Sequence, residues 1–157
     1  MKTSAKQVIF ERVVPQNFKE FSNLMGKLAE YERLAPPDPE ATERLRKDCL
    51  SKNPRFEAFL VKKSDIAVAY MMYFFTYSSF LALPTLFLED IFVLEEYRGQ
   101  GIGRRIFDFC KEIALKKGCG RIELTVLDWN KSAQKFYEEN KAQKSNWYFY
   151  RVDKNDF

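Results

Sequence analysis

Apolar side chains recur along the chain with two different periods, and these periods predict its secondary structure. Short apolar or alternating runs predict strands, over residues 7–13, 56–63, 66–77, 85–93, 121–127 and 147–152. Apolar residues at steps of three and four predict long helices over residues 18–33 and 102–117. Early strands followed by alternating strands and helices indicate a mixed α/β or α+β domain with a central sheet.

Turn and cap residues set the expected boundaries between these elements. Asp38 or Thr42 is expected to cap a second helix that runs to about Ser51, after a proline-rich break. A tight turn is expected at Ser64-Asp65, and Gly118 is expected to end the long second helix. A short helix is expected to start at Asn130 or Ser132 and to run through Glu139.

Composition narrows the class of protein. The chain has 157 residues with 46% hydrophobic and 16% aromatic residues, which predicts one folded domain over residues 1–157. No run reaches about 18 apolar residues, and residues 1–6 lack an apolar signal segment, so we expect no membrane partner. The net charge of +4 comes from interspersed charges, which favours a solvated mixed surface over a nucleic-acid-binding one.

Histidine and cysteine usage restricts the chemistry. The chain has no histidine, which excludes histidine-based triads and the common zinc sites, and we expect no metal. Proton transfer must then use carboxylates, tyrosine, lysine, cysteine or water. The three cysteines form no C-x-x-C pair, and Cys110 lies on the apolar face of a predicted helix, so a buried thiol and a reducing cytoplasmic compartment are expected.

A glycine-rich loop, Arg98-Gly99-Gln100-Gly101-Ile102-Gly103, joins the predicted strand 85–93 to the helix 102–117. Glycines leave main-chain N–H groups uncovered at the start of a helix, where the dipole favours an anion, so the loop suits a pyrophosphate. The spacing differs from G-x-G-x-x-G, and Gly103-Arg104-Arg105 does not supply the Gly-Lys-Ser/Thr of a P-loop. An ordinary strand–helix turn stays open as the alternative.

Two adjacent carboxylates, Glu89 and Asp90, interrupt the apolar run that precedes this loop. An unpaired charge is costly to bury, so their presence needs a reason. Neighbouring residues on a strand face opposite sides of the sheet, which predicts different surroundings for the two. A functional role and a structural salt bridge both remain open for each carboxylate.

The glycine loop resembles a known signature. Residues 97–103 match the Q/R-x-x-G-x-G/A motif of the GNAT-type N-acetyltransferases, where the motif binds the pyrophosphate of acetyl-coenzyme A. Further segments look like the diamine branch of that superfamily, which includes the spermidine/spermine and thialysine acetyltransferases: 27–32, 73–77, 88–93, 129–130 and 136–137. The resemblance implies a central, mostly antiparallel twisted sheet flanked by helices, with a splayed strand pair that holds the cofactor.

The same resemblance implies roles for individual residues. Tyr137 matches the proton donor to the leaving sulfur, and Glu89 matches a residue that binds the amine and helps to remove its proton, which makes these two the expected catalytic residues. The matching substrate-binding residues are Tyr31, Glu32, Glu89 and Asp90. The matching cofactor-binding residues are Ile91, Phe92, Val93, Arg98, Gly99, Gln100, Gly101, Ile102, Gly103, Arg104, Asn130, Lys131, Ser132 and Ala133.

The chain departs from the branch after Tyr137. Lys141 stands where the family usually has glycine, and the acidic residue that grips the far ammonium of spermine has no counterpart, with Lys144 nearby instead. We therefore expect direct acetyl transfer from acetyl-CoA to a primary amine of a small polyamine or diamine-like substrate, without spermine specificity. A protein lysine or N-terminal acetyltransferase and a non-catalytic CoA-binding regulatory module remain the alternatives. The resemblance also implies a homodimer.

Overall fold

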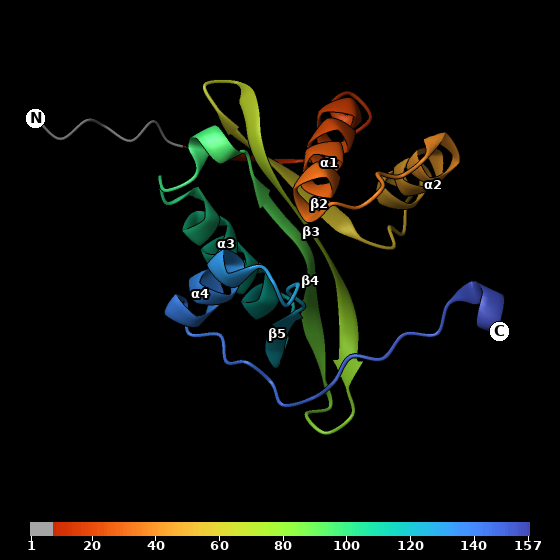
Figure 1. Ribbon diagram of the computed structural model, residues 1–157, viewed down its shortest axis with the longest axis vertical. Coiled ribbons are helices and arrows are strands. Elements are labelled where there is room, and N and C mark those ends of the chain that lie inside the picture. The colour runs from red at the N-terminus through yellow and green to blue at the C-terminus, as the bar shows by residue number, and fades with distance from the viewer. Residues whose placement is uncertain (1–7) are drawn as a thin grey trace, which may run out of the picture. The chain divides into compact units, whose positions relative to one another are not determined.

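The computed structural model describes residues 8–157, so the predicted strand start at Gln7 lies outside the described residues. The chain divides into two compact units, one up to Thr125 and one from Val126 to Phe157. Figure 1 shows the sheet and three larger helices of the first unit, and the helix α4 of the second. Each unit is described here by itself.

The first unit contains five strands and three α-helices. Its strands are β1 (Ile9–Arg12), β2 (Glu57–Lys63), β3 (Ile66–Ser78), β4 (Leu83–Val93) and β5 (Arg121–Leu124). Its helices are α1 (Phe18–Glu32), α2 (Pro39–Leu50) and α3 (Ile102–Lys116), with a short 3-10 turn η1 (Glu95–Tyr97) before α3. All of these strands and α-helices coincide with predicted ones, although β5 is shorter than the predicted 121–127.

The five strands form one sheet in the order β1-β2-β3-β4-β5. Every neighbouring pair is antiparallel except β4 and β5, which run parallel, so the sheet is mostly antiparallel as predicted. The β3–β4 ladder contains a bulge: Asp90 lies opposite Met72, Leu88 lies opposite Tyr73, and Glu89 has no partner. A bulge of this kind interrupts the alternation of side chains and re-aims them.

Helices cover both faces of this sheet, with α1 and α2 on one side and α3 on the other (Figure 1). On the α1 face, the Phe21 ring packs edge-on against Tyr70 at 5.3 Å between centroids, within a cluster that includes Leu60 and Phe92. On the α3 face, Phe109 stacks on Phe10 at 4.4 Å. Burial of these rings and of the helix stripes supplies the main favourable free energy of folding.

The predicted turn and cap residues act as expected. Asp38 accepts a hydrogen bond from the main-chain N–H of Ala41 at 2.7 Å, which caps α2. Ser64 and Asp65 both have positive φ, 51° and 65°, the conformation of a tight hairpin turn with the right twist for its strands. Gly118 adopts a φ of 65° directly after α3, where a left-handed residue closes the helix.

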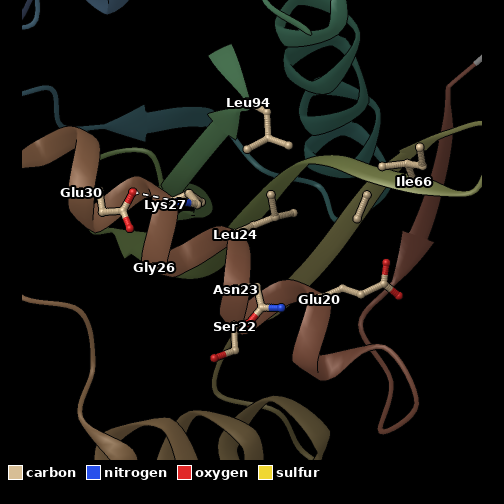
Figure 2. Close-up of a pocket in the computed structure, with 10 residues that line it drawn as sticks. Glu20, Ser22, Asn23, Leu24, Gly26, Lys27, Glu30, Ile66 and Leu94 are labelled. Atoms are coloured by element: carbon tan, nitrogen blue, oxygen red, sulfur yellow. Dashed lines mark hydrogen bonds and ion pairs between the residues drawn. The ribbon is translucent and has the colours of Figure 1, made fainter. Parts of the chain in front are cut away.

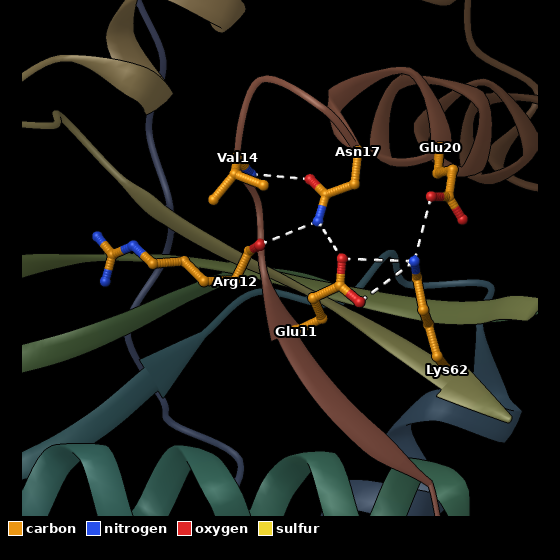
Figure 3. A network of polar contacts seen from close by, with 6 residues as sticks. All are labelled: Glu11, Arg12, Val14, Asn17, Glu20 and Lys62. Carbon is orange, nitrogen blue, oxygen red and sulfur yellow. Dashed lines mark hydrogen bonds and ion pairs between the residues drawn. The ribbon is translucent and has the colours of Figure 1, made fainter. Parts of the chain in front are cut away.

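A polar network fastens the β1–α1 junction to β2 (Figure 3). Asn17 accepts a hydrogen bond from the Val14 N–H at 2.8 Å and donates one to Glu11 at 2.6 Å. Lys62 lies between two carboxylates, 3.2 Å from Glu11 and 3.2 Å from Glu20. The network therefore fixes where α1 starts, and each carboxylate in it has a cation.

The second unit contains α4 (Lys131–Glu139) and a short 3-10 turn η2 (Lys154–Asp156). Asn130 caps α4 by accepting a hydrogen bond from the Ala133 N–H at 3.1 Å, as predicted. The prediction of a final strand over 147–152 is wrong, because these residues have no strand pairing in the part of the chain that the structure describes. Trp147 and Tyr150 are 80% and 87% exposed. An aromatic run favours a strand only when a sheet edge accepts its main chain.

Candidate active site

The glycine loop presents a set of uncommitted main-chain donors. Gly99 and Gly101 have φ values of 71° and 77°, a left-handed conformation that favours glycine. Gly101 is the N-cap of α3, and the Arg105 N–H donates to its carbonyl at 3.2 Å. Among the described residues none accepts a hydrogen bond from the N–H groups of residues 99–104. This arrangement fits the diphosphate of acetyl-CoA, because converging N–H groups at a helix start bind anions.

Polar side chains of the loop contact neighbouring elements, and one basic side chain pairs within α3. Arg98 donates from Nε to the Val93 carbonyl at 2.9 Å, and its guanidinium lies over the Tyr31 ring at 4.6 Å. Gln100 accepts a hydrogen bond from Lys63 at 2.6 Å. Arg104 forms an ion pair with Asp108 at 3.0 Å on the first turns of α3. Arg98 thus links the predicted cofactor loop to the end of α1, where the predicted substrate residues begin.

The end of β4 has an open edge on the side of β5. The parallel pairing covers Thr85 to Leu88 and stops, since β5 ends at Leu124. Leu94 donates its N–H to the Val68 carbonyl at 2.9 Å, on the opposite edge toward β3. Because successive residues of a strand point their main-chain groups to alternate edges, Ile91 and Val93 direct theirs to the β5 side. This is the splayed strand pair that was expected, and it suits the amide-bearing pantetheine arm.

Acidic side chains gather where α1 ends and β4 bulges. Glu32 is in the last turn of α1, and Glu89 and Asp90 are at the bulge. Asp90 accepts a hydrogen bond from the hydroxyl of Tyr70 at 3.1 Å. No ion pair joins any of these three carboxylates to a cation within residues 8–157. We call Glu32, Glu89, Asp90 and Tyr70 the acidic cluster.

The carboxylates of the acidic cluster influence each other's ionisation. Burial, and then the charge of Glu89, raises the pKa of Glu32. Burial raises the pKa of Asp90 to about 7, with the Glu89 charge acting in the same direction and the hydrogen bond from Tyr70 opposing it. Burial and the neighbouring Asp90 charge also raise the pKa of Tyr70. A bound cation would relieve this repulsion, so the cluster is suited to receive an ammonium group.

The remaining predicted residues lie in the second unit. Lys131, Ser132 and Ala133 form the first turn of α4 behind the Asn130 cap, and Tyr137 lies near its end, with its ring edge-on to that of Phe136 at 5.1 Å between centroids. Both rings are half-buried. Lys141, which replaces the family glycine, has a φ of 69°, so it adopts the backbone conformation that glycine favours after a helix.

Two features of the acidic cluster had no sequence prediction. The bulge at Glu89 depends on the register between β3 and β4, which no local pattern specifies. Tyr70 stands in the apolar run of β3, so its sequence context indicates only a core aromatic. Its hydroxyl was the available signal, because a buried phenol needs a hydrogen-bond partner.

A pocket of about 610 Å³ lies elsewhere in the first unit (Figure 2). It is lined by residues of α1, by Ile66 and Ala67 at the start of β3, and by Leu94. None of the predicted site residues lines this pocket. Its lining combines Glu20, Lys27 and Glu30 with apolar side chains, and nothing in that set offers acetyl-transfer chemistry.

Two searches over the described residues 8–157 gave negative results. None of the helices there is both long and apolar enough to cross a membrane. No group of three or more histidine, cysteine, aspartate or glutamate side chains in that range is placed to hold a metal ion.

Comparison with known proteins gives matches over most of the chain. The Acetyltransferase (GNAT) family matches residues 21–141. Thialysine N-epsilon-acetyltransferase of Mus musculus is 34% identical over 142 residues, which cover 83% of each chain. Spermidine/spermine N(1)-acetyltransferase-like protein 1 of Homo sapiens is 26% identical over 148 residues, which cover 87% of this chain and 21% of the human protein.

Solved structures agree on the fold. An integron cassette protein of V. cholerae superposes with a TM-score of 0.81 at 21% identity, over 95% of this chain and 94% of the other. Proteins of the matching family use acetyl-CoA as acyl donor, and the glycine loop and open β4 edge of this chain fit that donor. The chain belongs to the GNAT acetyltransferase family and is an N-acetyltransferase whose relatives include the thialysine and spermidine/spermine branch.

Proposed function

We propose that this enzyme transfers the acetyl group of acetyl-CoA directly to a primary amine of a small diamine-like substrate, in a ternary complex. The observation that carries the proposal is the acidic cluster at the end of β4, which forms no ion pair with a cation among residues 8–157. It lies in the same unit as the glycine loop, whose N–H groups have no acceptor among those residues. The relative that acts on thialysine supports an amine carried on a short side chain. Tyr31 and Glu32 at the end of α1 complete the amine site, where the helix dipole also favours a cation.

The reaction needs a neutral amine and a protonated leaving group. An alkyl ammonium has a pKa of about 10, so the site must remove a proton before the nitrogen attacks the thioester carbonyl. In the proposed reaction Glu89 holds the amine and assists its deprotonation, and Tyr137 donates a proton to the departing sulfur. A main-chain N–H at Ile91 or Val93 polarises the carbonyl.

The cysteines support direct transfer over an acetyl-cysteine intermediate. Burial raises the pKa of Cys110 to about 12 and that of Cys49 to about 11, so both thiols stay protonated at neutral pH. Protonated buried thiols are poor nucleophiles. These reduced cysteines also fit the proposed cytoplasmic location.

Steady-state kinetics tests direct transfer. In double-reciprocal plots of initial velocity against one substrate at several concentrations of the other, a ternary complex gives intersecting lines. Parallel lines would contradict direct transfer.

A panel of amines tests the function. Purified protein with acetyl-CoA should release free CoA thiol in the presence of short diamines and lysine-like amino acids, and less with spermine. Release with peptides alone would favour the protein acetyltransferase. Acetyl-CoA binding without any release would favour the regulatory module.

Two matched pairs of variants test the assigned residues. Tyr137→Phe should lower kcat by roughly 10²- to 10³-fold with little change in acetyl-CoA affinity, whereas Tyr148→Phe, at an 86% exposed tyrosine, should change neither.

Gly101→Ala should weaken acetyl-CoA binding about tenfold or more because of its positive φ. Gly26→Ala, in α1 with open space around it, should leave that affinity unchanged.

The assembly proposed from the family resemblance is a homodimer. The exposed aromatic residues of the second unit, such as Trp147 and Tyr148, support a partner surface, because isolated monomers seldom leave such groups in water. Analytical ultracentrifugation at micromolar concentration should give twice the mass of the chain, and a monomer mass would overturn this assembly.

A further inference from the structure

Two buried tyrosines on β3 each donate a hydrogen bond to a carboxylate, and they do so on opposite faces of the sheet. Tyr70, on the α1 face, is 0% exposed and donates to Asp90 at 3.1 Å. Tyr73, opposite Glu57 in the register, is 1% exposed and donates to that carboxylate at 3.1 Å. Glu57 also has an ion pair with Arg12 at 2.8 Å, whereas Asp90 has a phenol and two neighbouring carboxylates.

The bulge determines what surrounds Asp90. Asp90 lies opposite Met72 and diagonal to Tyr70, so its side chain is on the α1 face with Phe92. Glu89 is the unpaired residue of the bulge and is exposed. Two adjacent carboxylates therefore differ: Glu89 is open to solvent, and Asp90 is half-buried under a fixed donor.

Packing fixes the Tyr70 hydroxyl. The ring contacts Phe21 of α1 at 5.3 Å and Phe92 of β4 at 6.3 Å between centroids. A fully buried ring held on two sides has little rotameric freedom, so its hydroxyl stays directed at Asp90.

We propose that Tyr70 is a positioning residue for acetyl transfer, and that it holds Asp90 as the group that receives the proton of the substrate ammonium. This inference rests on the proposed function and goes further, because it separates binding of the amine by Glu89 from storage of its proton. The N–H bond of the ammonium breaks and its proton moves to Asp90. The nitrogen lone pair then forms the bond to the acetyl carbonyl, the C–S bond breaks, and the sulfur takes the Tyr137 proton. The nitrogen loses its second N–H proton to become a neutral amide, and this proton passes through solvent to the Tyr137 phenolate. Asp90 finally releases its own proton to solvent.

The ionisation of Asp90 agrees with this assignment. A proton acceptor works best when its pKa lies near the working pH, and burial with the Glu89 charge brings the pKa of Asp90 to about 7. The charged groups that act on Asp90 are Glu89 on its own strand and Glu32 on α1, with Tyr70 as the donor from β3. The Tyr70 hydrogen bond lowers the pKa of Asp90, so its removal should raise it.

The test is the pH dependence of kcat/KM for Tyr70→Phe, with a good amine substrate. On the acidic side of the profile, kcat/KM falls as Asp90 becomes protonated, and we call this fall the acidic limb. Loss of a hydrogen bond to a charged group should move the midpoint of the acidic limb to higher pH by about one unit. At pH values below the limb, kcat/KM should fall about tenfold, and well above the limb it should match the wild type. Asp90→Asn should lower kcat at least 100-fold with a small change in the KM for the amine.

Tyr73→Phe is the matched control, because it removes an equally buried hydroxyl from a carboxylate outside the site. It should leave the acidic limb in place, whatever its effect on stability. An unchanged limb in Tyr70→Phe, or an equal shift in both variants, would overturn the inference.

A second readout does not depend on activity. In a carboxyl-carbon NMR titration of the free protein, one aspartate should titrate near pH 7, vanish in Asp90→Asn and move upward in Tyr70→Phe. If no aspartate titrates above about pH 6, the inference is wrong even if the enzyme acetylates amines. If the wild type acetylates no amine but the resonance behaves as described, the proposed function fails and the Tyr70–Asp90 pair stands.

Discussion

Two groups of carboxylates in the first unit differ in one respect: the presence of a cation. In the network of Figure 3, Glu11 and Glu20 share Lys62, and burial alone would lower the pKa of Lys62, but the two carboxylates raise it. The hydrogen bond from Asn17 lowers the pKa of Glu11. In the acidic cluster, Glu32 and Asp90 have no cation in the described chain, and burial raises the pKa of both. The first group stabilises the fold. The second has no positive charge to balance its carboxylates in the described chain, and an ammonium group of a substrate can supply one.

The largest expected effect comes from a substitution that places a lysine in the acidic cluster. Glu89→Lys should lower kcat/KM for the amine by about 10³-fold or more, because the new ammonium occupies the charge position of the substrate and repels it. The thermal midpoint should not fall, since the new charge faces Glu32 and Asp90. Steady-state assays and thermal melts measure the two effects.

Glu112→Lys is the control for this charge reversal, because Glu112 is exposed on α3. It makes the same charge change away from the cluster and should keep kcat/KM within about twofold. Comparable losses in both variants would mean that net charge, and not the cluster, governs amine use.

The next effect concerns stability. Lys62→Met should lower the free energy of unfolding by about 2 kcal/mol, because Glu11 and Glu20 lose the cation that they share. Denaturant titration measures this loss. Lys27→Met breaks the exposed pair with Glu30 and should cost less than about 0.5 kcal/mol. Equal costs would remove the distinction between this partly buried network and an exposed surface pair.

A smaller effect depends on pH. The folded-state pKa of Asp90, about 7, lies above its ordinary value of 3.8, so the folded protein binds the extra proton between these values. Stability therefore falls as pH rises through that window, because the unfolded chain releases this proton while the folded protein keeps it, and the penalty is absent below the window. Asp90→Asn should gain roughly 2–4 °C in midpoint relative to wild type between pH 4.5 and 7.5. A constant difference across that range would contradict the raised pKa.

The smallest effect is that of salt. Attraction between an ammonium and the acidic cluster is partly screened, so the KM for the amine should rise about two- to fivefold from 0.05 to 0.5 M salt. The KM for acetyl-CoA at the glycine loop serves as the internal comparison. An amine KM that does not respond to salt would indicate that apolar contacts dominate amine binding.

Local patterns predicted much of this structure, and non-local pairing accounts for the misses. The predicted strands 56–63, 66–77 and 85–93 are observed, because their alternation and turns are encoded within each segment. The strand over 147–152 was predicted wrongly because an alternating aromatic run forms a strand only where another strand pairs with it, and none of the five described strands does. Glu89 and Asp90 stood out as charges in an apolar run, but the bulge that gives them different surroundings arises from pairing with β3.

The early end of β5 has an evolutionary consequence. In the proposed complex, the groups on β4 that face the acyl donor are the peptide amides of Ile91 and Val93, and every residue except proline supplies the same amide. Mutation can therefore alter the side chains of α1 and the β4 bulge, and with them the choice of amine, while the donor is still recognised. One scaffold can in this way change its amine specificity and keep its binding of the acyl donor.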